Sequence, residues 1–178
     1  MIETQAHPGT DPAASSWERF ERLYRSSRDD VFGYVCTLLR DRAAAEDVTA
    51  LAFERAYRRR LTFDRRRGEE RAWLFGIARN AALDELRRRR RLASLTADPE
   101  DVADAGVEDG AEVALRRTAV RSALAELPAR DREVIALKFH AGLRTAELAQ
   151  VLGLSETAAG TLLYRAMEKL RRACDAKQ

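Results

Sequence analysis

The sequence is poor in the residues that build metal centres and disulfide frameworks. It has 2 cysteines and 2 histidines in 178 residues. Cys36 and Cys174 lie far apart, so we expect small, reduced thiols. Neither His7 nor His140 follows a carboxylate by three residues, so the chain offers no helical ligand pair for a metal-dependent hydrolase. We therefore predict no metal, no cofactor and no catalytic site, and that the protein is not an enzyme.

Long apolar runs and strand patterns are also missing. No stretch approaches the roughly 18 apolar residues that a membrane span needs, and the N-terminus has no apolar signal core. We expect no membrane insertion and a cytoplasmic protein. The alternating period of β-strands is absent, so the predicted fold class is all-α.

Lysine is scarce, since arginine supplies nearly all of the 32 basic residues. Arginine binds phosphates and base edges with a planar fork, although genomic coding composition explains the bias equally well. The charge is also unevenly spread. Residues 93–115 hold many carboxylates, Pro99 and two glycines but no lysine or arginine, which is typical of a flexible acidic linker.

This pattern divides the chain into a disordered tail (1–15), an N-terminal helical domain (16–91), the linker (92–115) and a C-terminal domain (116–178). In the first domain, Ser16 is predicted to cap a helix and a second apolar set, 31–38, to form another. Asp41 is predicted to cap a third helix, which runs to Tyr57. After a loop around Gly68, a long helix is expected over about 70–91.

The second domain carries a helix-turn-helix signature in TAELAQVLGLSETAAGTLLYR (145–165). Pro128 suits the first turn of a preceding helix, which Gly142 ends. Ala149 allows the two helices of the motif to approach closely, and Gly153 supplies the left-handed turn residue. Leucines 148, 152 and 154 are expected to pack between these helices. The signature predicts DNA binding.

Further blocks carry a wider resemblance. They read AEDVTALAFERAYR (45–58), RAWLFGIARNAALDELRRRRR (71–91) and ALAELPARDREVIALKFHAGL (123–143). With the helix-turn-helix they resemble, in order, the sigma-70 family of bacterial RNA polymerase sigma factors, in its extracytoplasmic-function (ECF) subfamily. The resemblance implies that the first domain binds the polymerase clamp helices and opens the minus-ten promoter element. It implies that the second domain docks on the polymerase flap and reads the minus-thirty-five element.

For the minus-ten element, arginines beside aromatic faces suit unstacked single-stranded DNA. Phe63 is the better stacking candidate, because Trp73 and Phe75 lie in an apolar helical stretch that predicts core positions. Asn80 has two open interpretations, adenine recognition or a polar bridge between helices. The predicted contacts are Phe63, Arg65, Arg66, Arg79, Asn80, Asp84, Arg87 and Arg88.

For the minus-thirty-five element, the predicted contacts are Arg144, Thr157, Thr161, Tyr164, Arg165 and Lys169. Family members commonly carry lysine and arginine where this chain has Gly160 and Leu162. We therefore predict weak or unusual recognition of that element.

The polymerase contact is predicted at Glu46, Asp47, Ala50, Leu51 and Arg55. The family usually has a Gln-Glu pair where this chain has Ala50 and Leu51. Two outcomes stay open, a more apolar contact or a weaker one.

The resemblance also implies core polymerase, promoter DNA and an anti-sigma protein as partners. In the family the linker threads through polymerase channels, and carboxylates suit a basic channel. The alternative is a helix-turn-helix regulator that acts on duplex DNA without core polymerase. That alternative explains the missing Gln-Glu pair but not the arginine-rich, aromatic helix ahead of an acidic linker.

Overall fold

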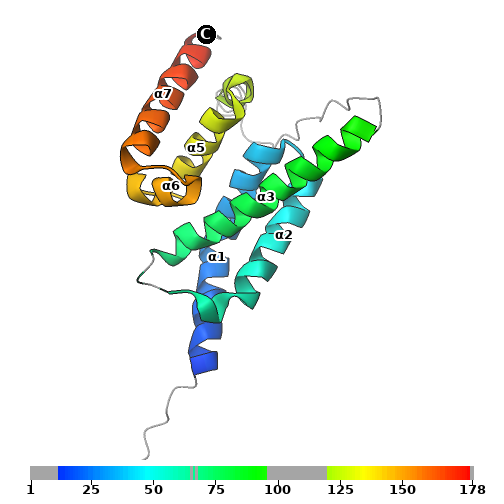
Figure 1. The fold of residues 1–178 in the computed structure, drawn as a ribbon, viewed down its shortest axis with the longest axis vertical. Coiled ribbons are helices and arrows are strands. Elements are labelled where there is room, and N and C mark those ends of the chain that lie inside the picture. The colour runs from blue at the N-terminus through cyan, green and yellow to red at the C-terminus, as the bar shows by residue number, and fades with distance from the viewer. Residues whose placement is uncertain (1–11, 65, 67, 96–119, 177–178) are drawn as a thin grey trace, which may run out of the picture.

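The computed structural model describes residues 12–64, 66, 68–95 and 120–176, and these are helical apart from short connections. The predicted all-α class is confirmed. The elements are α1 (Pro12–Leu39), α2 (Arg42–Arg58), the 3-10 turn η1 (Arg60–Thr62), α3 (Glu70–Leu95), α5 (Ala129–Phe139), α6 (Thr145–Leu152) and α7 (Glu156–Asp175) (Figure 1). Residues 120–126 form a further helical segment ahead of α5. No helix in these ranges is long and apolar enough to cross a membrane.

Three boundaries differ from the sequence-based expectation. The apolar sets predicted as separate helices both belong to α1, because residues 25–30 contain neither glycine nor proline to break the helix. α1 also begins at Pro12, inside the predicted tail, since proline is tolerated in a first helical turn. α3 continues to Leu95, past the predicted end near Arg91. The rest of the predicted tail and linker lies outside the described residues.

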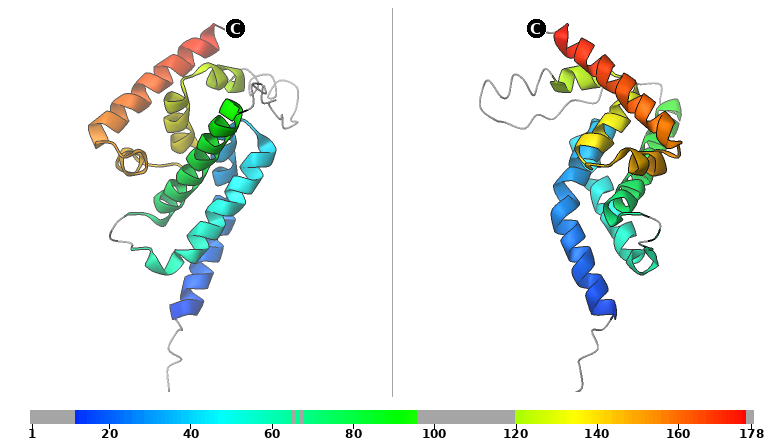
Figure 2. Two further views of the ribbon diagram at one scale, coloured as in Figure 1. Left: turned by 45° about the vertical axis from the view of Figure 1, so that its right-hand side comes forward. Right: turned by 90° about the vertical axis from the view of Figure 1, so that its left-hand side faces the viewer.

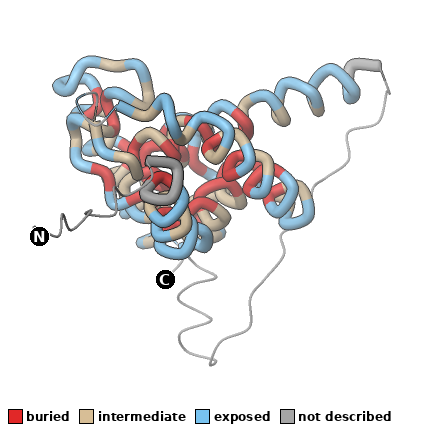
Figure 3. The backbone as a smooth tube through the Cα atoms, turned by 90° about the horizontal axis from the view of Figure 1, so that it is seen from below, coloured by how far each residue is buried: buried red, intermediate tan, exposed pale blue. Residues whose placement is uncertain are grey.

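The first domain consists of α1, α2 and α3 packed side by side. Asp41 caps α2 as predicted, accepting a hydrogen bond from the Ala44 backbone N–H at 3.1 Å. The core residues Val31, Tyr34, Val35, Leu74 and Phe75 are all fully buried. Buried positions gather toward the middle of the helical body, and exposed positions lie on its outer side (Figure 3). Alanines at the helix contacts, among them Ala45, Ala52, Ala56, Ala78 and Ala82, have 0% exposure and let the backbones approach closely.

The second domain contains the predicted helix-turn-helix. Gly153 ends α6 in the left-handed conformation (φ 66°), and the Ser155 hydroxyl caps α7 by accepting from the Ala158 N–H at 3.2 Å. Leu148 has 0% exposure and Ala149 6%, as expected for the seam between the two helices. The geometry of the motif is therefore confirmed.

The two domains are in contact, which the sequence did not predict. α5 packs on α1 and α6 packs on α3, so the buried apolar residues of both domains form one cluster (Figure 2). α3 begins near α6 and runs away from it, and its C-terminal end projects beyond the body of the molecule (Figure 1).

Candidate nucleic-acid interface

The exposed side of α3 carries four of the residues predicted to contact the minus-ten element. Asn80, Asp84, Arg87 and Arg88 are all exposed and recur at helical spacing. Asp84 accepts from Arg87 at 3.1 Å and lies 3.4 Å from an Arg55 amino group. Exposed ion pairs of this kind are weak, so phosphates can compete for these guanidinium groups.

The arginine run that follows is tied to neighbouring carboxylates. Arg88 donates to both Glu85 oxygens at 2.7 and 2.8 Å, and Arg89 donates to the same carboxylate. The hydrogen bonds from Arg88, followed by those from Arg89, lower the pKa of Glu85 to about 2. Glu85 therefore stays ionised and partly neutralises the run.

Two of the aromatic residues predicted beside the arginines pack against each other. Phe75 is a core residue, as predicted, with 0% exposure. Phe63, in the loop after η1, is half-buried and packs on Trp73 with ring centroids 5.2 Å apart. Arg66 is exposed in the same loop, whereas Arg65 lies outside the described residues. The two rings are tilted by 48°, and the role of Phe63 in base stacking stays a prediction.

Arg79 is placed differently from its neighbours on α3. Its Nε donates to Glu133 of α5 at 2.7 Å, and the two side chains are only 22% and 9% exposed. The predicted minus-ten contact is therefore occupied by the second domain in this structure. No spacing rule predicts this pair, because its members are separated by 54 residues.

The exposed side of α7 carries the residues predicted for the minus-thirty-five element. Thr157, Thr161, Tyr164 and Arg165 are all exposed, Tyr164 by 69%. Their spacing places them on one side of the helix. The Thr161 hydroxyl donates to the Thr157 carbonyl at 2.9 Å, which fixes its rotamer.

The two remaining predicted contacts of this domain also have structural partners. Arg144 is exposed, and the Glu147 carboxylate accepts from its backbone N–H at 2.7 Å and from its guanidinium at 3.2 Å at the start of α6. Lys169 donates to the buried carboxylate of Asp131 in the first turn of α5. Lys169 therefore links α7 to α5, a structural role that the sequence-based assignment did not include.

The two departures in the recognition helix, Gly160 and Leu162, are both half-buried and lie on opposite borders of its packed side. A Cβ at Gly160 would meet the Thr145 methyl at 3.6 Å. Leu162 is half-buried against the core. Half-burial of these two positions leaves weak minus-thirty-five binding as a prediction. That prediction remains untested.

The predicted polymerase contacts lie on α2. Glu46, Asp47 and Ala50 are exposed, whereas Leu51 is half-buried and packs on the core. The Glu46 carboxylate lies 3.3 Å from Arg42, one turn earlier on the same helix. The exposed side of α2 thus carries carboxylates beside the small apolar residue Ala50, together with arginines that pair with some of them.

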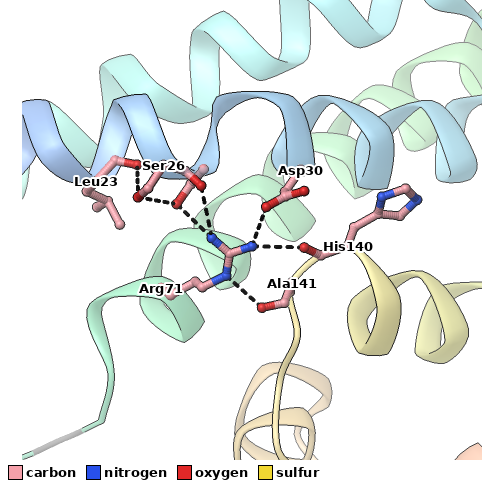
Figure 4. A network of polar contacts seen from close by, with 7 residues as sticks. Leu23, Ser26, Asp30, Arg71, His140 and Ala141 are labelled. Atoms are coloured by element: carbon pink, nitrogen blue, oxygen red, sulfur yellow. Dashed lines mark hydrogen bonds and ion pairs between the residues drawn. The ribbon is translucent and has the colours of Figure 1, made fainter.

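Sequence reasoning missed Arg71, a side chain that links α3 to both α1 and the end of α5. Its guanidinium, in the first turn of α3, lies between α1 and the end of α5 (Figure 4). It donates to groups 41 to 70 residues away in the chain. No signal in the sequence marks such a role.

The geometry described so far is an all-helical fold with a helix-turn-helix, the arrangement that places a recognition helix in the major groove of DNA. Models of sigma-70 region 2 and sigma-70 region 4 match residues 23–92 and 117–170. The chain is 36% identical over 162 residues to the ECF RNA polymerase sigma factor BldN of Streptomyces coelicolor, of which it spans 61%. It is 32% identical over 160 residues to the ECF RNA polymerase sigma factor SigL of Mycobacterium tuberculosis, and the match covers 89% of this chain and 90% of SigL.

Solved structures agree with the fold. The sigma factor RpoE of Bartonella quintana, in complex with the anti-sigma factor NepR, superposes with a TM-score of 0.77 over 90% of this chain and 99% of that one, at 22% identity. CnrH, in complex with the cytosolic domain of CnrY, gives a TM-score of 0.67 at 27% identity, with 93% of this chain and 96% of CnrH covered. The chain belongs to the ECF group of the sigma-70 family of RNA polymerase sigma factors. The comparisons do not favour a regulator that acts without polymerase.

Proposed function

We propose that this sigma factor binds core RNA polymerase through α2, opens the minus-ten element along α3 and reads the minus-thirty-five element with α7. One observation carries this assignment. Asn80, Arg87 and Arg88 are exposed along one helix whose first turns support the Phe63–Trp73 aromatic pair. Cationic groups beside aromatic rings suit a separated DNA strand, whose phosphates and bases are both accessible.

The contact with core polymerase is assigned to the exposed side of α2. Glu46 and Asp47 present carboxylates there, and Ala50 leaves room for a close approach. This contact is electrostatic at its edge and apolar at its centre, so we expect its affinity to fall as salt rises. An anti-sigma protein is the second proposed partner, by analogy with the relative solved with NepR.

Transcription in vitro tests the proposal. Core polymerase is incubated with genomic fragments, with and without the full chain, and start sites are mapped. Start sites that require the chain support the function and reveal its promoter elements. If the chain forms no stoichiometric complex with core polymerase and adds no start site, the assignment is wrong.

Matched arginine variants then test the role of α3. Arg88→Ala removes an exposed arginine that pairs with a carboxylate one turn earlier. Arg25→Ala removes an equivalent arginine on α1, which pairs with Glu21. We expect the α3 variant to reduce open-complex formation about tenfold, in line with the loss of a phosphate contact, while Arg25→Ala has no effect. If the two substitutions reduced open-complex formation equally, the assignment of the minus-ten contact to α3 would be wrong.

A further inference from the structure

A cleft lies between the end of α1, the middle of α3, the first turns of α5 and the end of α6. Its volume is about 380 Å³. Small-molecule sites in proteins have volumes of roughly 300–1,000 Å³. Of the DNA and polymerase contacts proposed above, Arg79 alone lines this cleft. The cleft is therefore a candidate site for a further ligand.

The apolar wall of the cleft comes from leucines of three helices. On α3, Leu83 and Leu86 follow Arg79 at spacings of four and three residues, which places all three on one side of the helix. Leu152 at the end of α6 and Leu38 of α1 complete the wall. Leu83, Leu86 and Leu152 are only half-buried, so they leave apolar surface that a ligand can cover.

The first turns of α5 supply positive charge to the same cleft. Arg130 is exposed, and no carboxylate in the described part of the chain pairs with it. Arg132 donates to backbone carbonyls, the nearest being that of Ala125 at 3.1 Å, and these neutral groups do not compensate its charge. Burial, followed by the charge of Arg40, lowers the pKa of Arg132. The surroundings of Arg132 thus favour the arrival of an anion.

The carboxylate that lines the cleft is already engaged. Glu133 accepts from Arg79 at 2.7 Å, and its side chain is 9% exposed. Since these two charges compensate each other, the two α5 arginines remain as uncompensated positive charges of the cleft.

This combination of groups selects the chemistry of the occupant. A neutral apolar molecule would cover the leucines but leave both guanidinium groups without an anion. A small inorganic anion would pair with the arginines but leave the leucines in water. Only a molecule with an anionic head and an apolar chain satisfies both walls.

We propose that the cleft binds a medium-chain carboxylic acid. Its carboxylate pairs with Arg130 and Arg132, and its chain lies along Leu83, Leu86 and Leu152. This site goes beyond the proposed function and does not depend on it, because neither polymerase nor DNA takes part in the binding.

Octanoate is the probe, with octanol as the uncharged control and butyrate as the short-chain control. Each is titrated into the full chain, and leucine methyl signals are followed by NMR. We expect octanoate to shift the signals of Leu83 and Leu86 saturably and to leave Leu61 of η1 unchanged. One methylene contributes about fourfold in affinity, so butyrate should bind on the order of a hundredfold more weakly. Octanol should bind about tenfold more weakly, because it lacks the charge-assisted hydrogen bonds.

Matched variants then locate the site. Leu83→Ala shortens the apolar wall, and Leu92→Ala is its control on the same helix, 49% exposed and outside the cleft. Arg130→Ala removes a charge, and Arg22→Ala removes an exposed arginine of α1. We expect Leu83→Ala to weaken octanoate binding about tenfold. Arg130→Ala should weaken octanoate about tenfold and leave octanol unchanged. Circular dichroism establishes that each variant is folded.

Three results would each overturn the proposal. They are the absence of a saturable shift below the concentration at which micelles form, equal affinities for octanoate and octanol, and folded test variants that match their controls. Because the titrations contain neither polymerase nor DNA, failure of this site is distinguishable from failure of the transcription assignment.

Discussion

Arg89 of α3 donates to Asp41 at 2.7 Å, and Asp41 is the residue that caps α2. One arginine of the run 87–91 is thus part of the first domain's framework, although its neighbours Arg87 and Arg88 are exposed. The contact joins the helix proposed to open DNA to the start of the helix proposed to bind polymerase.

Replacing Asp41 should destabilise the first domain. Asp41→Ala removes both the cap and the partner of Arg89, and we expect the free energy of unfolding to fall by about 1–2 kcal/mol. Asp41→Asn keeps the capping oxygen and loses only the charge, so its cost should be smaller. Urea denaturation of both variants measures the difference. Equal losses would mean that the cap contributes little.

Acid should weaken the same region. Hydrogen bonding to the Ala44 N–H and to Arg89 lowers the pKa of Asp41, and Arg88 lowers that of Glu85 to about 2. A carboxyl whose pKa is lower in the folded protein than in the unfolded chain stabilises the fold at a pH above its unfolded pKa. This stabilisation is lost as the pH falls through the folded pKa. We therefore expect the free energy of unfolding to decline from about pH 4.5 toward pH 2. Glu85→Gln should flatten part of this decline, and an unchanged profile would contradict the role of the Arg88–Glu85 pair.

Two glycines of the second domain should respond in opposite directions. Gly160 lies inside α7, where a Cβ makes an ordinary 3.6 Å contact with Thr145. Gly160→Ala should stabilise the domain by about 0.5–1 kcal/mol. Gly153 has φ 66°, so Gly153→Ala should destabilise it by about 1 kcal/mol. Thermal unfolding compares the two, and a destabilised Gly160→Ala would show that α7 packs more tightly than described.

The recognition side of α7 predicts a loss of duplex binding. Thr161→Ala combined with Arg165→Ala should weaken binding to minus-thirty-five duplex DNA by about tenfold or more. Arg22→Ala, an exposed change on α1, is the control. Fluorescence anisotropy with duplexes of matched and scrambled sequence measures the effect. Unchanged affinity in the double variant would place the contact elsewhere.

Local sequence patterns correctly predicted much of the fold. The Asp41 cap, the turn at Gly153 and the helix after Gly68 all depend on residues close together in sequence, where capping and glycine conformation act directly. The break predicted within α1 was wrong. The apolar residues before and after residues 25–30 lie on different sides of the helix, but such a change ends a helix only where a glycine or proline interrupts it.

Residue types in the sequence identified the predicted DNA contacts. They did not show which of these side chains are engaged by other parts of the protein. Asn80 and Tyr164 are exposed as a DNA contact requires, whereas Lys169 is engaged with Asp131 and Leu162 packs inward. The helical period determines on which side of a helix a residue lies. Which neighbouring element covers that side depends on tertiary packing.

The sequence by itself determined the helices, the helix-turn-helix and the family, because these depend on local spacing and on ordered motifs. Only the tertiary structure decided that Arg71 bridges α1 and α5 and that Arg79 is paired with Glu133. Those contacts join residues more than 40 positions apart. They arise where apolar surfaces from distant parts of the chain meet, and no local period or propensity encodes that meeting.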